Sequence, residues 1–269
     1  MTKLNRISIL CLAILGLHAG GCADISPGKL SNIQPLAEAK SPRVGRVYLF
    51  RGFIGVFSTG MNTLGEELNK QGVTTFVFQS DQWASVADTI AEQYKSNPRA
   101  EPVALVGHSY GADNIVRVAL RLKEKNVKVD LLITLDPVTP PKVPANVVRV
   151  VNLYQSNGAM DSLPWLRGIP LEAEQPNTVD VANLNIRKDR TDLLDNDLNH
   201  FNIEKKTKIH AEVIKQIQAI CVTRQVWAAR TAPPANAVYR AEARTTTGTV
   251  ANTLSAAPNS GTAPRAKVE

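Results

Sequence analysis

The chain has 269 residues, of which 43% are hydrophobic and 20% are charged. This length and composition allow one well-buried domain with tails and argue against wholesale disorder. The formal net charge is +7, but no block of lysine and arginine with interleaved aromatic residues stands out, so we expect no nucleic-acid partner.

The N-terminal residues have the pattern of a secretory signal. Lys3 and Arg6 precede an apolar run at residues 7–17 that is too short to span a bilayer permanently. We therefore expect residues 1–21 to be a signal peptide and the protein to be exported to the periplasm or cell envelope. The segment ending at Cys22 also resembles a bacterial lipobox, which implies a lipid anchor on Cys22 and attachment to a membrane. Plain cleavage near Cys22 is the alternative.

The number of cysteines argues against both a disulfide framework and a cysteine-rich zinc site. The chain has 3 cysteines: Cys11 lies inside the leader, Cys22 at its end and Cys221 far downstream. We therefore expect no disulfide framework, even in an oxidising compartment. The same count excludes cysteine-rich zinc sites, and there is no His-Glu-x-x-His segment, so we expect neither a metal nor a cofactor.

Changes in composition divide the mature chain into three parts. Residues 22–44 mix proline, serine, glycine and lysine without a sustained period, as expected of a linker. Residues 45–227 have the apolar periodicity of a folded domain. Residues 228–269 have few large apolar side chains and cannot bury enough surface to offset their ordering entropy, so we expect a disordered tail.

Inside the domain, short apolar runs alternate with helical patterns. The runs expected to be buried strands are residues 47–50, 73–78, 103–106, 131–135, 147–153 and 179–186. Apolar residues at helical spacing predict helices over about 83–94, 112–120 and 203–220. Such alternation implies a mainly parallel sheet of about six strands with helices on both faces, and reactive groups then collect at the carboxyl ends of the strands.

The strongest chemical signal is the sequence Gly-His-Ser-Tyr-Gly, which follows the expected strand 103–106. A serine on a sharp strand-to-helix turn has a strained backbone, so small residues are needed two positions away, and Gly107 and Gly111 supply them. The hydroxyl of Ser109 is then exposed above the sheet, with His108 and Tyr110 beside it. We predict a nucleophile elbow; a glycine turn that merely permits close packing is the alternative.

With this elbow, residues 45–227 resemble the α/β-hydrolase superfamily, most of all its thioesterase and lipase branches. The resemblance implies a single-domain α/β-hydrolase fold and an acyl-enzyme on Ser109. The implied substrate is a small-molecule or lipid acyl compound. The link at residues 136–146 is short and rich in proline, so we expect no cap domain. The longer insert at residues 155–178 is expected either to form one wall of an acyl pocket or to cover the core.

A serine hydroxyl needs an adjacent base, and histidine has the suitable pKa. The chain has 4 histidines. His18 lies in the leader, and His108 is expected to point away from the nucleophile. His200 lies in a polar loop between the last strand and the last helix, where the family places its base. His210 shares a helical face with isoleucines, as a core histidine would. We predict His200 as the base, with His210 as the alternative.

The third member of a triad is a carboxylate at another strand end, which orients the base. Asp136 directly follows the strand 131–135, a placement similar to that in polyketide thioesterases and pancreatic-type lipases. Many other hydrolases place the acid one strand later, where Asp161 is the alternative. A turn-forming Asp-Pro pair is the non-catalytic explanation for Asp136. Asp197 is expected to orient the base loop or the start of the helix.

Acyl transfer also needs hydrogen-bond donors for the oxyanion. We expect the backbone N–H of Tyr110 and one from the loop after the first strand, with Phe53 the best candidate. Relatives have His-Gly where this chain has Arg51 and Gly52, and a plain glycine turn is the alternative.

The predicted function is hydrolysis of a carboxylic ester or thioester by an exported serine hydrolase. Two other classes stay open. One is a non-catalytic cell-envelope lipoprotein that uses the scaffold for binding, and the other is an acyltransferase with the same triad.

Overall fold

The computed structural model describes residues 41–53, 58–96, 101–156, 163 and 167–232. The expected signal peptide (1–21), the lipidation site Cys22 and most of the expected linker and tail lie outside the described residues. The chain divides into two compact units, the first ending at Arg224 and the second beginning at Gln225. Within the described ranges, no helix has the length and apolar character needed to cross a bilayer.

The first unit is built on one parallel sheet of 6 strands, in the order β2-β1-β3-β4-β5-β6. Its strands are β1 (Arg46–Phe50), β2 (Thr74–Phe78), β3 (Val103–His108), β4 (Leu131–Leu135), β5 (Arg149–Tyr154) and β6 (Asp180–Asn185). Each strand overlaps one of the predicted apolar runs. The central strands are apolar on both faces because helices cover both faces, which confirms the predicted α/β fold class.

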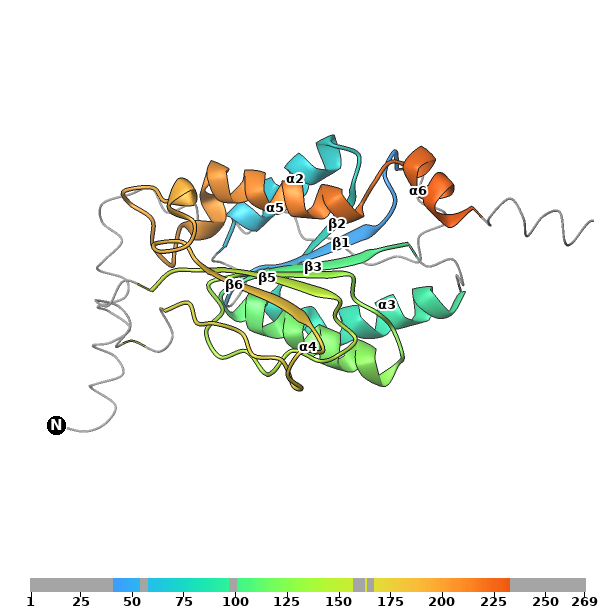
Figure 1. Cartoon of the computed structure of the whole chain (residues 1–269), viewed down its shortest axis with the longest axis horizontal. Coiled ribbons are helices and arrows are strands. Elements are labelled where there is room, and N and C mark those ends of the chain that lie inside the picture. The colour runs from blue at the N-terminus through green and yellow to red at the C-terminus, as the bar shows by residue number, and fades with distance from the viewer. Residues whose placement is uncertain (1–40, 54–57, 97–100, 157–162, 164–166, 233–269) are drawn as a thin grey trace, which may run out of the picture. The chain divides into compact units, whose positions relative to one another are not determined.

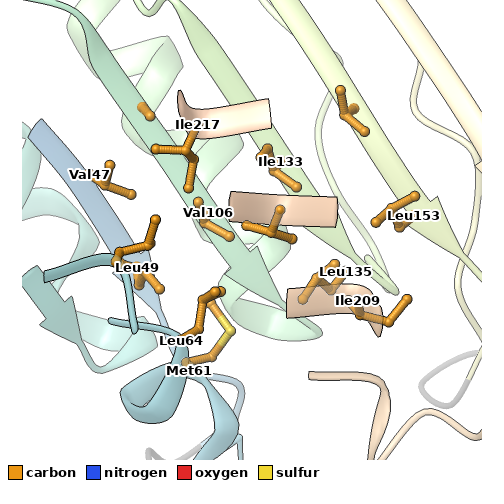
Figure 2. Close-up of a cluster of buried hydrophobic side chains, with 14 of the residues drawn as sticks. Val47, Leu49, Met61, Leu64, Val106, Ile133, Leu135, Leu153, Ile209 and Ile217 are labelled. Atoms are coloured by element: carbon orange, nitrogen blue, oxygen red, sulfur yellow. The ribbon is translucent and has the colours of Figure 1, made fainter. Parts of the chain in front are cut away.

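Helices pack on both faces of the sheet (Figure 1). They are α2 (Gly60–Lys70) and α5 (Thr207–Ile220) on one face, and α3 (Trp83–Ser96) and α4 (Tyr110–Glu124) on the other. Neighbouring strand residues point to opposite faces, so Val106 packs in the cluster with α2 and α5 while Leu105 packs in the cluster with α3 and α4. Figure 2 shows the first cluster, where Ile209 and Ile217 of α5 meet the strand side chains.

Two helices differ from the prediction. α2 was not predicted, because Gly60 and Gly65 lower the helix propensity of a segment whose apolar residues are few. The last helix was expected from residue 203, but residues 203–205 form a separate 3-10 turn, η3 (Ile203–Lys205). Lys206 is extended, with φ −78° and ψ 125°, so α5 begins only at Thr207.

The alternation of strand and helix stops after β4. Residues 136–148, all of which are described, contain no helix, so no cap is inserted between β4 and β5. Proline lacks the N–H that a helix needs, which accounts for this extended link. In the insert before β6, Leu171 packs in the cluster with α3 and α4. This part of the insert therefore covers the core, which was one of its two predicted roles.

The last helix is α6 (Arg224–Thr231), which lies in the second unit from Gln225 onward and has no buried side chain. Residues 228–231 lie in this helix, whereas the sequence predicted a disordered tail from residue 228. Ala228, Ala229 and Arg230 are strong helix formers, and a helix already in progress extends through them.

Candidate active site

Ser109 lies at the turn between β3 and α4. Its φ of 55° and ψ of −125° are unusual for a residue with a side chain. A Cβ on Gly107 would lie 2.4 Å from the carbonyl oxygen of Gly111. A Cβ on Gly111 would lie 2.4 Å from the carbonyl oxygens of Phe50 and Arg51. The turn therefore has the backbone geometry and the need for two glycines that characterise a nucleophile elbow.

The imidazole of His200 reaches Ser109 from the loop between β6 and α5. Its Nε2 lies 2.9 Å from Oγ of Ser109, a hydrogen-bond distance. The His200 side chain is buried, whereas Ser109 is half-buried. With its proton on Nδ1, the imidazole accepts the serine proton at Nε2 and leaves the hydroxyl oxygen available for attack.

Asp136 faces the other nitrogen of the same imidazole. Its carboxylate is fully buried, and Oδ2 lies 3.4 Å from Nδ1 of His200. Neither of these two atoms has another hydrogen-bond partner among the described residues. Oδ1 accepts the backbone N–H of Gln155 at 2.7 Å, which holds the carboxylate in place. The 3.4 Å separation is longer than a well-formed N–H···O bond, and catalytic hydrogen bonds commonly shorten when substrate binds.

The alternative residues have other surroundings or are not described. Asp161 lies outside the described residues. Both carboxylate oxygens of Asp197 bind Nζ of Lys206, at 2.6 and 2.7 Å, on the surface. His210 is buried, with Nδ1 2.9 Å from Glu67 and Nε2 2.7 Å from a backbone carbonyl oxygen. In the described part of the chain, no group of three or more His, Cys, Asp or Glu side chains could hold a metal ion.

Exposed aromatic side chains border Ser109. The rings of Phe53 and Tyr110 have centroids 5.8 Å apart, so the two residues expected to supply oxyanion donors are neighbours. Phe201 packs edge-on against the ring of His200, with centroids 5.6 Å apart. These side chains are 56%, 40% and 48% exposed, respectively. We call Phe53, Tyr110 and Phe201 the aromatic rim.

Sequence reasoning missed the polar side chains that connect Asp136 to the loop that carries His200. The guanidinium of Arg187 donates to Oε1 of Gln155 at 2.9 Å and to the carbonyl oxygen of Leu198 at 2.8 Å. Because the N–H of Gln155 binds Asp136, these bonds connect Asp136 to the loop that carries His200. Gln155 and Arg187 belong to no motif. The only available signal was their place just after two strands, at the edge where reactive groups collect.

Asp113 joins α4, which begins directly after Ser109, to the loop that follows Asp136. It lies in the first turn of α4 and is fully buried. Its two carboxylate oxygens accept the N–H groups of Val138 and Thr139, each at 2.9 Å. Burial raises the pKa of Asp113, and these hydrogen bonds act in the opposite direction. The hydrogen bonds therefore offset part of the cost of burying this carboxylate.

Two further charged side chains are buried near the triad. Arg51 and Glu204 are each fully buried. The pKa of Glu204 is raised to about 7, mainly because the side chain is buried; the charges of Lys205 and Arg51 lower this pKa, and the charge of Asp136 raises it. Neither carboxyl oxygen of Glu204 has a hydrogen-bond partner on another described residue. Arg51, the residue before Gly52 in the loop after β1, therefore belongs to the interior.

No family model matches this chain, and no curated protein matches it. Several solved structures are similar to it, including the following three. A hydrolase of the alpha/beta superfamily from Xanthomonas campestris pv. campestris is 15% identical, with a TM-score of 0.33, over 64% of this chain and 99% of that chain. A serine hydrolase without a lid from Xanthomonas campestris is 15% identical, with a TM-score of 0.37, over 72% and 85%. The RedJ thioesterase from the prodiginine biosynthetic pathway in Streptomyces coelicolor is 12% identical, with a TM-score of 0.38, over 77% and 95%.

Proposed function

We propose that this protein is a serine hydrolase that cleaves a carboxylic ester or thioester through an acyl-enzyme on Ser109. One observation carries the proposal. On a strained turn, Oγ of Ser109 lies 2.9 Å from Nε2 of His200, while a buried carboxylate, that of Asp136, faces the other ring nitrogen. A serine, an imidazole and a carboxylate from three separate segments supply a nucleophile, a base and the group that orients the base.

The first half of the reaction forms the acyl-enzyme. Oγ of Ser109 attacks the carbonyl carbon while its proton moves to Nε2 of His200, and Asp136 stabilises the resulting imidazolium. The backbone N–H groups of Tyr110 and Phe53 are the proposed donors to the oxyanion. When the intermediate collapses, the proton on Nε2 passes to the leaving alcohol or thiol. Water then repeats the sequence, releasing the carboxylic acid and restoring the hydroxyl of Ser109.

The aromatic rim supports an apolar group on the substrate beside the scissile bond. Its three side chains are exposed close to the reacting atoms. Covering such rings with an alkyl or aryl group removes apolar surface from water, at about 25 cal/mol per Å². A substrate with an apolar acyl or alcohol part therefore gains binding energy next to Ser109.

Labelling with a fluorophosphonate tests the nucleophile directly. The wild-type protein should be labelled, Ser109→Ala should not, and Ser85→Ala, which removes an exposed serine of α3, should be labelled like wild type. Wild type and Ser85→Ala should also hydrolyse a short-chain nitrophenyl ester, and Ser109→Ala should not. Equal labelling of wild type and Ser109→Ala would remove the assignment.

A second candidate function is a non-catalytic binding module on the hydrolase scaffold. The 3.4 Å gap between Nδ1 of His200 and Oδ2 of Asp136 favours it, because an unformed bond leaves the base poorly oriented. This candidate predicts a folded protein that is not labelled by the fluorophosphonate. It also predicts no turnover of esters or thioesters across a series of acyl chain lengths.

Export and membrane attachment are part of the same proposal. The pattern of residues 1–21 and the cysteine at 22 support a lipid anchor in the cell envelope. Expression of the full chain in bacteria fed an alkyne-tagged fatty acid should label the wild-type protein and not Cys22→Ser. Equal labelling of the two proteins would contradict the anchor.

A further inference from the structure

His108, the residue before the nucleophile, uses both of its ring nitrogens. Nε2 lies 2.8 Å from the carbonyl oxygen of His200, and a carbonyl only accepts, so this nitrogen carries the proton. Nδ1 lies 2.6 Å from Oγ of Ser58, which in turn accepts the backbone N–H of Gly52 at 3.0 Å. In the neutral ring Nδ1 is the acceptor, so the hydroxyl of Ser58 donates to it. Donation therefore runs in one direction from Gly52 through Ser58 and His108 to His200.

The surroundings of His108 keep its ring neutral. The side chain is buried, and its ring centroid lies 5.2 Å from that of His200. Burial is the main reason why the pKa of His108 lies well below its usual range; the nearby imidazole of His200 and the charge of Lys205 act in the same direction, and the hydrogen bond to the carbonyl of His200 acts in the opposite one. A neutral ring that must donate from Nε2 has only one tautomer, so both hydrogen bonds are defined.

Apart from the bond that Arg187 donates to the carbonyl oxygen of Leu198, the loop that carries His200 is shaped by short-range hydrogen bonds. The side chains of Asn199 and Asn202 bind the backbone carbonyl of Asp197, each at 2.9 Å. Bonds of this kind set the shape of the loop without fixing its distance from β3. His108 stands at the end of β3, directly before Ser109, and its bond to the carbonyl of His200 spans the two segments.

We propose that His108 is a positioning residue that holds the imidazole of His200 at Ser109 and ties the loop of Gly52 to the same framework. The inference rests on the proposed function, in which His200 is the base. Since a displacement of about 1 Å in a reacting group can slow a reaction by about 100-fold, a backbone contact at the base has a direct effect on rate. The contact to Gly52 matters because this residue precedes Phe53, a proposed oxyanion donor.

Two substitutions separate the two hydrogen bonds of His108. In His108→Gln the amide nitrogen stands as many bonds from Cα as Nε2, so a donor to His200 is retained. In His108→Asn the amide reaches only the position of Nδ1, so a partner for Ser58 is retained and the donor to His200 is lost. With a short-chain nitrophenyl ester, we expect kcat to fall about 30-fold in His108→Asn and less than about 5-fold in His108→Gln. KM should stay within about threefold in both, because a displaced base slows the chemical step.

Asn146→Ala is the control for a merely structural loss. The amide of Asn146 donates to the carbonyl oxygens of Ala119 and Val127, at 3.0 and 2.8 Å, near the start of β4 and away from the catalytic edge. Its loss should lower the urea midpoint and leave kcat within about twofold of wild type. Equal kcat values in the two histidine variants would overturn the positioning role. The role would also be overturned if, across all three variants, the loss of kcat were proportional to the decrease in the urea midpoint.

Nuclear magnetic resonance separates failure of this inference from failure of the proposed function. In proton–nitrogen spectra of histidine-labelled full-length protein, His108 should be the neutral tautomer with its proton on Nε2. The ring signals of His200 should shift in His108→Asn far more than in His108→Gln. Both results are independent of turnover. A proton on Nδ1 of His108, or His200 signals that do not move, would overturn the inference. If the spectra are as expected but the fluorophosphonate does not react with Ser109, only the proposed hydrolase function is overturned.

Discussion

Ser109 and Asp136 both have positive φ, 55° and 48°, which costs a residue with a side chain about 1–3 kcal/mol. Each stands directly after a strand, β3 or β4, and the surrounding bonds hold it there. The N–H of Ser109 binds the carbonyl of Leu135 at 2.9 Å, and the N–H of Asp136 binds that of Leu153 at 3.0 Å. The strained backbone thus aims both side chains toward one edge of the sheet, where His200 meets them.

Asp136→Asn should disable the base while leaving the fold intact. The amide oxygen can still accept the N–H of Gln155, but the amide nitrogen then faces Nδ1 of His200 as a donor. The imidazole is driven to carry its proton on Nε2, where it cannot accept from Ser109. We expect kcat to fall by roughly three to four orders of magnitude with a short-chain ester. Asp197→Asn, which changes a surface carboxylate, should stay within about twofold, and a comparable loss there would contradict the assignment of Asp136.

Glu204 should make the protein less stable as the pH rises. Its pKa of about 7 in the folded chain is above the ordinary value of 4.5, so the folded state binds the proton more tightly. The contribution is fully present below about pH 4.5 and is lost as the pH rises through about 7. Between about pH 5 and pH 8, wild type should lose up to about 3 kcal/mol of unfolding free energy relative to Glu204→Gln. Urea unfolding at both pH values measures this, and parallel pH profiles would contradict it.

At the level of elements, β3, the turn and α4 form one rigid unit around Ser109. The strand is buried along its whole length, and α4 buries nine residues against the sheet and its neighbours. Gly107 and Gly111 let the helix begin close to the strand that it leaves. The buried carboxylate of Asp113 in α4 also binds the loop after Asp136, so the unit extends to the end of β4.

Gly111→Ala should destabilise this unit strongly. Its new Cβ would lie 2.4 Å from two backbone carbonyl oxygens, and backbone cannot move aside as a flexible side chain can. We expect a loss of more than about 3 kcal/mol of unfolding free energy by urea titration. Gly65→Ala in α2 is the matched control, because its Cβ would meet a methyl group of Val77 at 2.9 Å. A loss in Gly111→Ala no larger than in Gly65→Ala would contradict the tight turn.

On the scale of the whole first unit, one sheet supports two apolar layers. Successive residues of β4 face opposite layers: Leu132 packs in the cluster with α3 and α4, and Ile133 packs in the cluster with α2 and α5. Ile133 pairs in register with Val106 and Val151, so neighbouring central strands contribute side chains to the same layer. Figure 2 shows Ile133 and Val106 in this layer. Because both layers are built on the same strands, unfolding of the sheet would expose the apolar side chains of both layers.

Leu132→Ala and Ile133→Ala should therefore each weaken the unit as a whole. Both side chains are fully buried, so each truncation should cost about 2–5 kcal/mol. Since Trp83 packs in the layer with α3 and α4, its fluorescence and far-ultraviolet circular dichroism should change in one urea transition for both variants. Separate transitions for the two probes in Ile133→Ala would show that the layers unfold independently.

Much of the fold could be predicted because its signals are local. The six apolar runs became six strands, and the elbow sequence placed Ser109 between a strand and a helix. Elimination among four histidines left His200 and His210. α2 and the break at Lys206 were missed, because glycines weaken a helical pattern and the break depends on the conformation of a single residue.

The rest depends on which distant segments the sheet brings side by side. Chain periodicity sets the strand positions, but the order β2-β1-β3-β4-β5-β6 puts the ends of β3 and β4 next to each other, and with them Ser109 and Asp136. The contacts of His108, Gln155 and Arg187 follow from that order and leave no trace in local sequence, because a hydrogen bond across the chain has no fixed spacing. The amino-acid sequence therefore contains the reactive groups, and folding sets the distances between them.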